Sequence, residues 1–106
     1  MEFKMAKWAD YLISAVHYTE TNKKRYISQV QVHVDKGDTV GPANIQSRAE
    51  VLTNIDNNFT FKTIFKNNNE WKEGENVRKV KINNYFYLKT DANNTEQDNL
   101  ENLPEF

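Results

Sequence analysis

Hydrophobic and polar residues alternate most clearly between residues 25 and 34. The apolar positions on one face are Tyr26, Val30, Val32 and Val34, and the polar positions on the other face are Gln29, Gln31 and His33. This period of two predicts a strand with one buried face. Residues 11–18 are rich in β-branched and aromatic types, which also predicts a strand. Only the polar residues 19–24 separate the two segments, so we expect an antiparallel hairpin.

A second alternating segment covers residues 59–66, with Phe59, Phe61 and Phe65 on its apolar face. The asparagine run that follows predicts a turn, because asparagine side chains bond their own backbone. The chain returns from Glu70 onward, and Gly74 indicates a bulge or bend in that return. The segments 77–82 and 85–89 flank Asn83-Asn84, a pair that suits a two-residue type I′ hairpin turn.

One short helix is predicted in the middle of the chain. Ser47 and Glu50 have the spacing of a capping box, in which each side chain bonds the other residue's backbone N–H. Val51, Leu52 and Ile55 form the apolar stripe of the helix, and Asn57-Asn58 is its expected C-cap. Upstream, the turn residues 35–38 end the preceding strand, and Gly41-Pro42 is expected to break the link to the helix.

This element order, ββ-α-βββ, predicts a single small domain of the α+β class. We expect a twisted antiparallel sheet of about five strands with one short helix packed on one face; a closed small barrel is the alternative. Trp8 and Trp71 are expected at the ends of the core. The residues expected to dominate the core are Val30, Val32, Val34, Val51, Leu52, Ile55, Phe59, Phe61 and Phe65.

Length and composition fit one globular domain. The chain has 106 residues, of which 38% are hydrophobic and 27% are charged. The formal net charge of −1 conceals an asymmetry, since residues 1–90 carry +4 and residues 91–106 carry −5. We therefore expect a compact domain over residues 1–90 and an acidic tail over residues 91–106. Met5 is an alternative start, which would leave residues 1–4 as an appendage outside the fold, and residues 1–5 are expected to be disordered.

The chain contains no cysteine, which excludes disulfides and thiolate chemistry and fits a reducing compartment. No apolar run approaches the roughly 18 residues that a membrane-spanning helix needs. The N-terminal residues also lack the apolar region of a signal peptide. We therefore expect a cytoplasmic protein without a membrane contact.

No pattern of reactive residues predicts catalysis. His17 and His33 are the only histidines, and the expected hairpin places them far apart on the ribbon. Ser14, Ser28 and Ser47 do not lie in a nucleophile-elbow motif. Three glycines are too few for a phosphate cradle. The paired acids around residues 35–38 and 73–75 are typical of solvated turns. We expect no enzyme, no metal site and no cofactor.

Basic residues near aromatic rings form one candidate binding surface. The basic positions are Lys23, Lys24, Arg25, Lys62, Lys66, Arg78, Lys79 and Lys81. With the rings of residues 85–87 they would suit an anionic ligand or single-stranded nucleic acid. The slightly acidic overall balance counts against this interpretation, because nucleic-acid-binding domains are typically basic. Exposed lysines on edge strands also protect against aggregation.

The acidic tail is a second candidate site. Leu100, Leu103 and Phe106 recur at every third residue among acidic side chains. They could dock in a groove of a partner protein. Alternatively they could fold back, with the apolar groups on the core and the acids on the basic strands. In the second case the tail would compete with an anionic ligand for the basic strands.

Several strings in the chain carry a resemblance to a known family. They are residues 6–16, residues 63–66 with Trp71 and Gly74 following, and the ending at residues 90–106. Together they resemble the domain-of-unknown-function family number 3892, whose members are small and mostly prokaryotic. The resemblance implies a stand-alone α+β domain and a native C-terminal string, and it implies no activity, cofactor or site residue.

Taken together, the sequence favours a non-catalytic binding or accessory module that contacts another protein. A weak nucleic-acid binder, acting through the basic strands and gated by the acidic tail, is the alternative.

Overall fold

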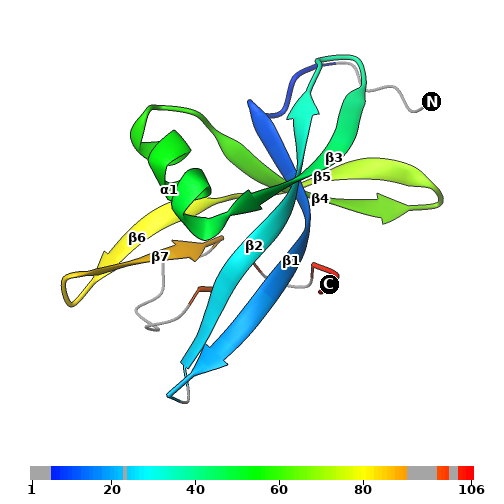
Figure 1. Cartoon of the computed structure of the whole chain (residues 1–106). Helices are drawn as coiled ribbons and strands as arrows, with labels where there is room; N and C mark the ends of the chain where they lie inside the picture. The colour runs from blue at the N-terminus through cyan, green and yellow to red at the C-terminus, as the bar shows by residue number, and fades with distance from the viewer. Residues whose placement is uncertain (1–5, 23, 91–97, 101–102) are drawn as a thin grey trace.

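In the computed structural model, residues 6–22, 24–90, 98–100 and 103–106 are described, and they form seven strands and one helix (Figure 1). The elements are β1 (Tyr11–Thr21), β2 (Lys24–Asp35), β3 (Val40–Ser47), α1 (Arg48–Asp56), β4 (Phe61–Asn67), β5 (Glu70–Asn76), β6 (Arg78–Ile82) and β7 (Tyr85–Lys89). The radius of gyration is 13.6 Å, close to the roughly 13 Å expected for a single domain of this length. The predicted α+β class and the single short helix are confirmed.

The strands form two sheets rather than one. The larger sheet has the order β3-β2-β1-β4-β5, and β6 and β7 pair separately. β1 pairs with β2 as the expected antiparallel hairpin, but it pairs with β4 in parallel over Tyr11–Ile13. The prediction of a purely antiparallel sheet is therefore wrong at this pairing. The sheet is also open, with β3 and β5 at its edges, so it is not the closed barrel of the alternative.

β3 differs from the sequence prediction, in which Gly41-Pro42 breaks the link to the helix. The segment instead pairs antiparallel with β2, from Gln29↔Ser47 to His33↔Ala43. A register shift follows between His33 and Asp35, so the proline lies at a bulge of an edge strand. Edge strands and bulges are the places in a sheet that tolerate proline, because its missing N–H is not needed there.

Local turn and cap signals formed as predicted. Ser47 and Glu50 make the reciprocal capping box, and Asn57 is the C-cap of α1. Asn83 and Asn84 adopt φ values of 51° and 72°, as a type I′ turn requires. The register of β4 and β5 shifts next to Gly74, which confirms the bulge predicted there.

The core lies on both faces of β1. Ile13 and Val16 belong to a larger cluster with the apolar side of α1 and with Leu88 and Leu100. Leu12 points to the opposite face, because side chains alternate along a strand. There it joins a smaller cluster with Ala9 and Ile64, against which Trp8 and Trp71 pack partly buried. The two tryptophans thus lie at the margin of the core, as expected.

The prediction that Val34, Phe59 and Phe65 belong to the core is wrong, because each side chain is substantially exposed. Val34 falls within the register shift between β2 and β3. Phe59 precedes β4 and contacts the ring of Tyr11 edge-on at the surface. Phe65 follows the point where β4 leaves β1 and pairs only with β5. Leu52 and Ile55 are partly buried, whereas Val30, Val32, Val51 and Phe61 are buried as predicted.

Candidate functional site

The β6–β7 hairpin presents lysines beside an aromatic ring. Its register places Lys81 opposite Phe86 and Lys79 opposite Leu88, and directly paired residues share one face of a sheet. The Nζ atoms of Lys79 and Lys81 lie 4.1 Å and 5.9 Å from the centre of the Phe86 ring. These are cation–π distances, so the hairpin combines positive charge with an exposed ring.

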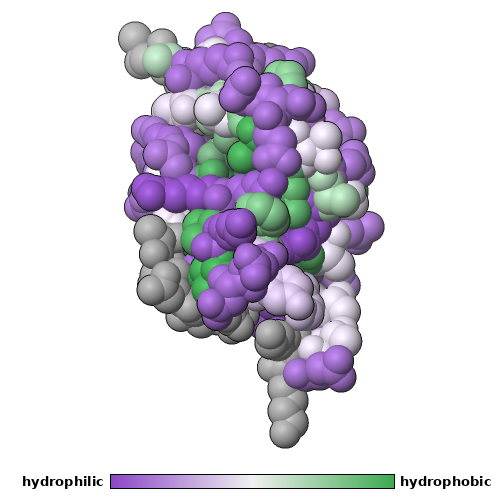
Figure 2. Space-filling view, turned by 90° about the vertical axis from the view of Figure 1, so that its left-hand side faces the viewer, coloured by the Kyte–Doolittle hydropathy of each residue, from purple (hydrophilic) through white to green (hydrophobic). Residues whose placement is uncertain are grey.

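A groove of about 400 Å³ lies between this hairpin, α1 and β2. Its lining residues are Tyr26, Arg48, Leu52, Tyr85, Phe86 and Tyr87, and we call it the aromatic groove. The exposed fractions of Tyr85 and Phe86 are 67% and 43%. Figure 2 views the molecule from the α1 and β6–β7 side and shows apolar side chains surrounded by polar ones. The volume is within the usual range of ligand sites.

Arg48 connects the groove to the end of the chain. Its Nε and Nη2 atoms donate to the two carboxylate oxygens of Asp98 at 2.8 Å and 3.1 Å, and Nη2 also donates to the Phe86 carbonyl at 2.6 Å. The Asp98 side chain is fully buried, whereas that of Arg48 is partly exposed. Two parallel N–H···O bonds fix the guanidinium in a defined orientation.

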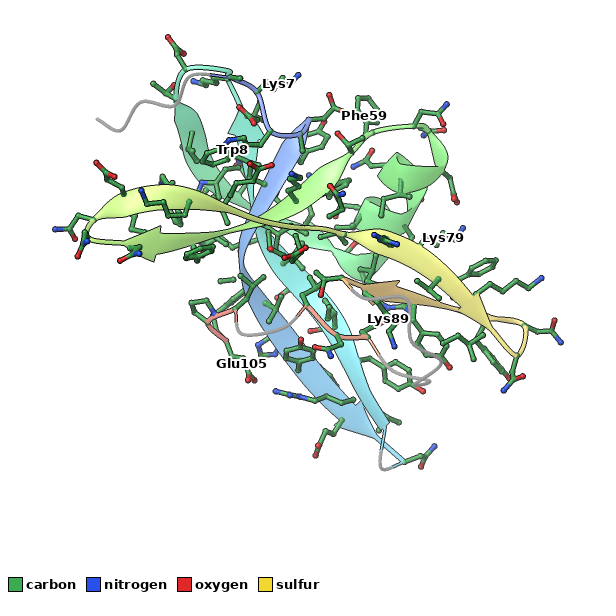
Figure 3. The ribbon with its side chains drawn as sticks, turned by 180° about the vertical axis from the view of Figure 1, so that it is seen from behind. Lys7, Trp8, Phe59, Lys79, Lys89 and Glu105 are labelled. Carbon is green, nitrogen blue, oxygen red and sulfur yellow. The ribbon has the colours of Figure 1, made fainter. Side chains whose placement is uncertain are left out.

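The predicted basic residues lie on three different hairpins. Arg25 is at the β1–β2 hairpin, Lys62 and Lys66 are on β4, and Arg78, Lys79 and Lys81 are on β6. Lys23 lies outside the described residues, and so does the side chain of Lys24. Figure 3 shows Lys79 and Glu105 on opposite sides of the β1–β2 ribbon. Of the predicted cations with described side chains, Lys79 and Lys81 are the ones that lie beside the ring of a groove residue, Phe86.

Several of these cations already contact carboxylates and rings of the same chain. Lys79 binds Asp56 at 2.8 Å, and Lys62 binds Glu73. Arg25 lies 3.8 Å from the centre of the Tyr18 ring and bonds Glu105 at 2.6 Å. This hydrogen bond raises the pKa of Arg25 above its ordinary value. Lys66 lies over the ring of Trp71 at 4.8 Å.

We use the term C-terminal segment for the described residues 98–100 and 103–106. Leu100 is fully buried in the larger core cluster, and Leu103 packs against that cluster. Val16 accepts from the Phe106 N–H and donates to the Pro104 carbonyl, both at 2.9 Å, along the edge of β1 that β4 leaves free. Phe106 itself is exposed beside the ring of His17. Residues 91–97 and 101–102 of the acidic tail lie outside the described residues.

The structure also joins Ser14 and His33, which the sequence did not connect. The Ser14 hydroxyl lies 2.8 Å from His33 Nε2, and His33 Nδ1 lies 2.8 Å from the Gly41 carbonyl. Because a carbonyl only accepts, Nδ1 carries a proton, and in the neutral ring Nε2 then accepts from Ser14. Gln31 donates to the same hydroxyl at 3.2 Å. Each of Ser14 and His33 is only 6% exposed, so the pair connects β1, β2 and β3 inside the fold.

Sequence reasoning missed two residues that line the aromatic groove, Tyr26 and Arg48, and the carboxylate of Asp98 that bonds Arg48. The alternating pattern places Tyr26 on a strand without connecting it to residues 85–87, and no sequence pattern singles out Arg48 or Asp98. Asp98 follows none of the local patterns that predict burial, because its partners on β2 and β7 lie 71 and 10 positions away in the chain. The one sequence feature that hinted at a contact between the tail and the body is the change in sign of the net charge from residues 1–90 to residues 91–106.

Within the described ranges, no three His, Cys, Asp or Glu side chains gather closely enough to hold a metal ion. No helix in the described part of the chain has the length and apolar character needed to cross a membrane.

Comparison with known proteins gives one finding. No curated protein and no solved structure matches the chain. A family model described as a protein of unknown function, DUF3892, matches residues 12–104. The match starts after residues 6–11, which had contributed to the resemblance, and it includes every strand from β2 to β7 and most of the C-terminal segment. The chain therefore belongs to the DUF3892 family of proteins of unknown function.

Proposed function

We propose that this chain is a non-catalytic module that binds a protein partner in its aromatic groove. The partner segment is one that carries an apolar anchor side chain next to acidic residues. The observation that carries this proposal is a groove lined by four aromatic residues, Leu52 and Arg48, in which Tyr85 and Phe86 are exposed to solvent. Tyrosine and arginine are enriched at the energetic centres of protein interfaces, and a contiguous exposed apolar patch typically marks an interaction surface.

The charge around the groove supports an acidic segment. Lys81 lies beside the ring of Phe86, one of the residues that line the groove. The guanidinium of Arg48 lines the groove itself. A partner with carboxylates around its anchor would meet a complementary rim, which favours fast association and a defined orientation.

Two features favour a protein over nucleic acid as the ligand. Single-stranded nucleic acid needs open ring faces for base stacking and a continuous track of cations for the phosphates. Here cations already lie over the rings of Tyr18, Trp71 and Phe86. Lys62 and Lys79 also contact carboxylates of the same chain. Taken together, the predicted cations with described side chains lie on three separate hairpins and form no continuous track.

The environment of Ser14 and His33 supports the non-catalytic part of the proposal. The pair has the hydrogen-bond geometry of a nucleophile and its base. Yet both side chains are almost completely buried among the strands, so a substrate carbonyl would have to displace packed core residues to reach the hydroxyl. A structural bond across β1, β2 and β3 accounts for the arrangement.

A displayed library of random short peptides, selected on the full chain, tests the proposal. We expect a consensus in which an aromatic or aliphatic residue adjoins Asp or Glu. When the consensus peptide is titrated into isotope-labelled protein, the amide shifts should cluster in α1 and β7. Tyr85→Ser should weaken binding roughly tenfold, because an anchoring ring contributes about 1–3 kcal/mol. Phe65→Ser is the matched control, since Phe65 is also an exposed ring but lies on the β4–β5 hairpin.

Two outcomes would contradict the proposal. One is a consensus peptide whose shifts map away from α1 and β7, or whose binding is equally sensitive to Tyr85→Ser and Phe65→Ser. The other comes from a mixed-sequence oligonucleotide added at low and high salt. Shifts at β6 and β7 that vanish as salt is added would favour the nucleic-acid alternative, because phosphate contacts weaken steeply with salt.

A further inference from the structure

Asp98 accepts hydrogen bonds from three separate elements of the fold. Its Oδ2 atom accepts from the Ile27 N–H at 2.9 Å, and its Oδ1 atom accepts from the Leu88 N–H at 2.8 Å. The fork of Arg48 donates to both oxygens. One fully buried carboxylate thus bonds β2, β7 and the start of α1 at the same time.

These three elements are also the walls of the aromatic groove. Ile27 directly follows Tyr26, and Leu88 directly follows Tyr87. Arg48 lines the groove and holds the Phe86 carbonyl. Each hydrogen bond to Asp98 therefore originates from a groove residue or from its immediate neighbour in the chain.

Strand pairing does not provide this connection in the described part of the chain. β2 belongs to the five-stranded sheet, and β7 belongs to the separate β6–β7 pair. Asp98 connects the two sheets through a backbone N–H on each. Its neighbour Asn99 continues along β7, donating to the Leu88 carbonyl at 2.8 Å and accepting from the Thr90 N–H at 3.1 Å.

We propose that Asp98 is a positioning residue of the aromatic groove, and that docking of the C-terminal segment and ligand binding in the groove stabilise each other. The second half of this inference rests on the function proposed above. A carboxylate brings together walls that belong to different sheets, so the groove has its open shape only while the segment is docked. By reciprocity, a ligand that binds the formed groove holds the segment in place to the same degree.

The chemistry at Asp98 is specific to a carboxylate. All of its described partners are donors, namely two backbone N–H groups and a guanidinium. An asparagine of the same size accepts through one oxygen only, and its amide N–H groups would face these donors. Asp98→Asn thus keeps the volume of the side chain and removes the arrangement that holds the walls together, because it leaves buried donors without an acceptor.

The test compares Asp98→Asn with Glu105→Gln in the full chain. Glu105 is also a carboxylate of the C-terminal segment, but it is exposed and bonds Arg25, away from the groove. Without ligand, we expect Asp98→Asn to shift the amide signals of residues 85–87 and to speed hydrogen exchange at Ile27 and Leu88. Glu105→Gln should leave these signals unchanged.

With the consensus peptide selected on the wild type, Asp98→Asn should weaken binding roughly tenfold, within the 5–150-fold range of typical coupling. The peptide should also slow hydrogen exchange at Leu100 and Phe106 in the wild-type chain, a measurement that needs no folded variant. A peptide that binds both proteins equally, or that leaves these amides unchanged, would overturn the inference while the proposed function stands. If no peptide binds the groove, the proposed function fails, and the ligand-free comparison alone decides whether Asp98 positions the walls.

Discussion

Gly74→Ala is the substitution whose cost can be worked out most directly from the structure. A Cβ atom at this position would lie 2.3 Å from Thr63 Oγ1 and 2.7 Å from the Thr63 carbonyl oxygen. The carbonyl belongs to the backbone of β4 and cannot rotate away. The hydroxyl can rotate, but it would then lose the hydrogen bond that it accepts from the Glu75 N–H at 2.9 Å.

Two contributions determine the expected magnitude. Overpacking against backbone costs about 1–3 kcal/mol, and the lost hydrogen bond adds about 1 kcal/mol. We therefore expect Gly74→Ala to lower the free energy of unfolding by about 2–4 kcal/mol, which corresponds to a fall in Tm of roughly 10–20 °C for a domain of this size. Urea denaturation followed by tryptophan fluorescence measures this, since Trp71 lies on the same strand.

Two further variants separate steric from conformational effects. Gly37 has a φ of +88° and open space around its missing Cβ, so Gly37→Ala should cost only the left-handed backbone penalty of about 1–2 kcal/mol. In a Thr63→Ala background, Gly74→Ala should cost less than in the wild type, because one of its two clashes is gone. A loss below about 0.5 kcal/mol for Gly74→Ala, the size of an ordinary surface substitution, would refute the close approach of β4 and β5.

Three other predictions concern the ends of single elements. The pKa of Asp10 lies below its ordinary value because the Thr60 N–H donates to its carboxylate. Asp10→Asn should therefore destabilise the fold at neutral pH. Urea denaturation should show the difference in unfolding free energy between wild type and variant shrinking as pH falls below 3.8 and through the folded-state pKa. Ser47→Ala removes one half of the capping box and should lower the unfolding free energy by about 1 kcal/mol. Ser47→Thr should retain most of the stability that the cap contributes, and thermal melts of the two variants measure the difference. Asn84 has a φ of 72°, so Asn84→Val should destabilise the β6–β7 turn by about 1–2 kcal/mol and Asn84→Gly should not; equal melting temperatures for the two variants would contradict the positive φ.

Sequence reasoning was most successful where a few neighbouring residues determine the structure. The capping box at Ser47 and Glu50 and the turn at Asn83-Asn84 depend on hydrogen bonds and φ preferences within four residues or fewer. The alternation in β2 indicated the burial of Val30 and Val32, but Val34 is exposed at the bulge, and His33, which was expected on the polar face, is buried. Such signals act within one element, so the printed sequence contains them in full.

The candidate site was predicted only in part, because sequence signals act within one element and the site combines several elements. The aromatic and basic residues of the β6–β7 hairpin are near neighbours in the chain, and the sequence identified them. Tyr26 and Arg48 reach the same groove from β2 and α1, and no periodicity connects them to residues 85–87. Only the packing of the two sheets shows that these residues share a surface.

By itself, then, the sequence determined the turns, the helix with its caps, most of the strands and the α+β class, because these follow from propensities and patterns over a few residues. Tertiary structure decided which strands became neighbours. The parallel pairing of β1 with β4 and the recruitment of Gly41-Pro42 into β3 depend on contacts between distant segments. The burial of Asp98 is of the same kind, because a charged side chain enters the interior only where distant donors converge on it.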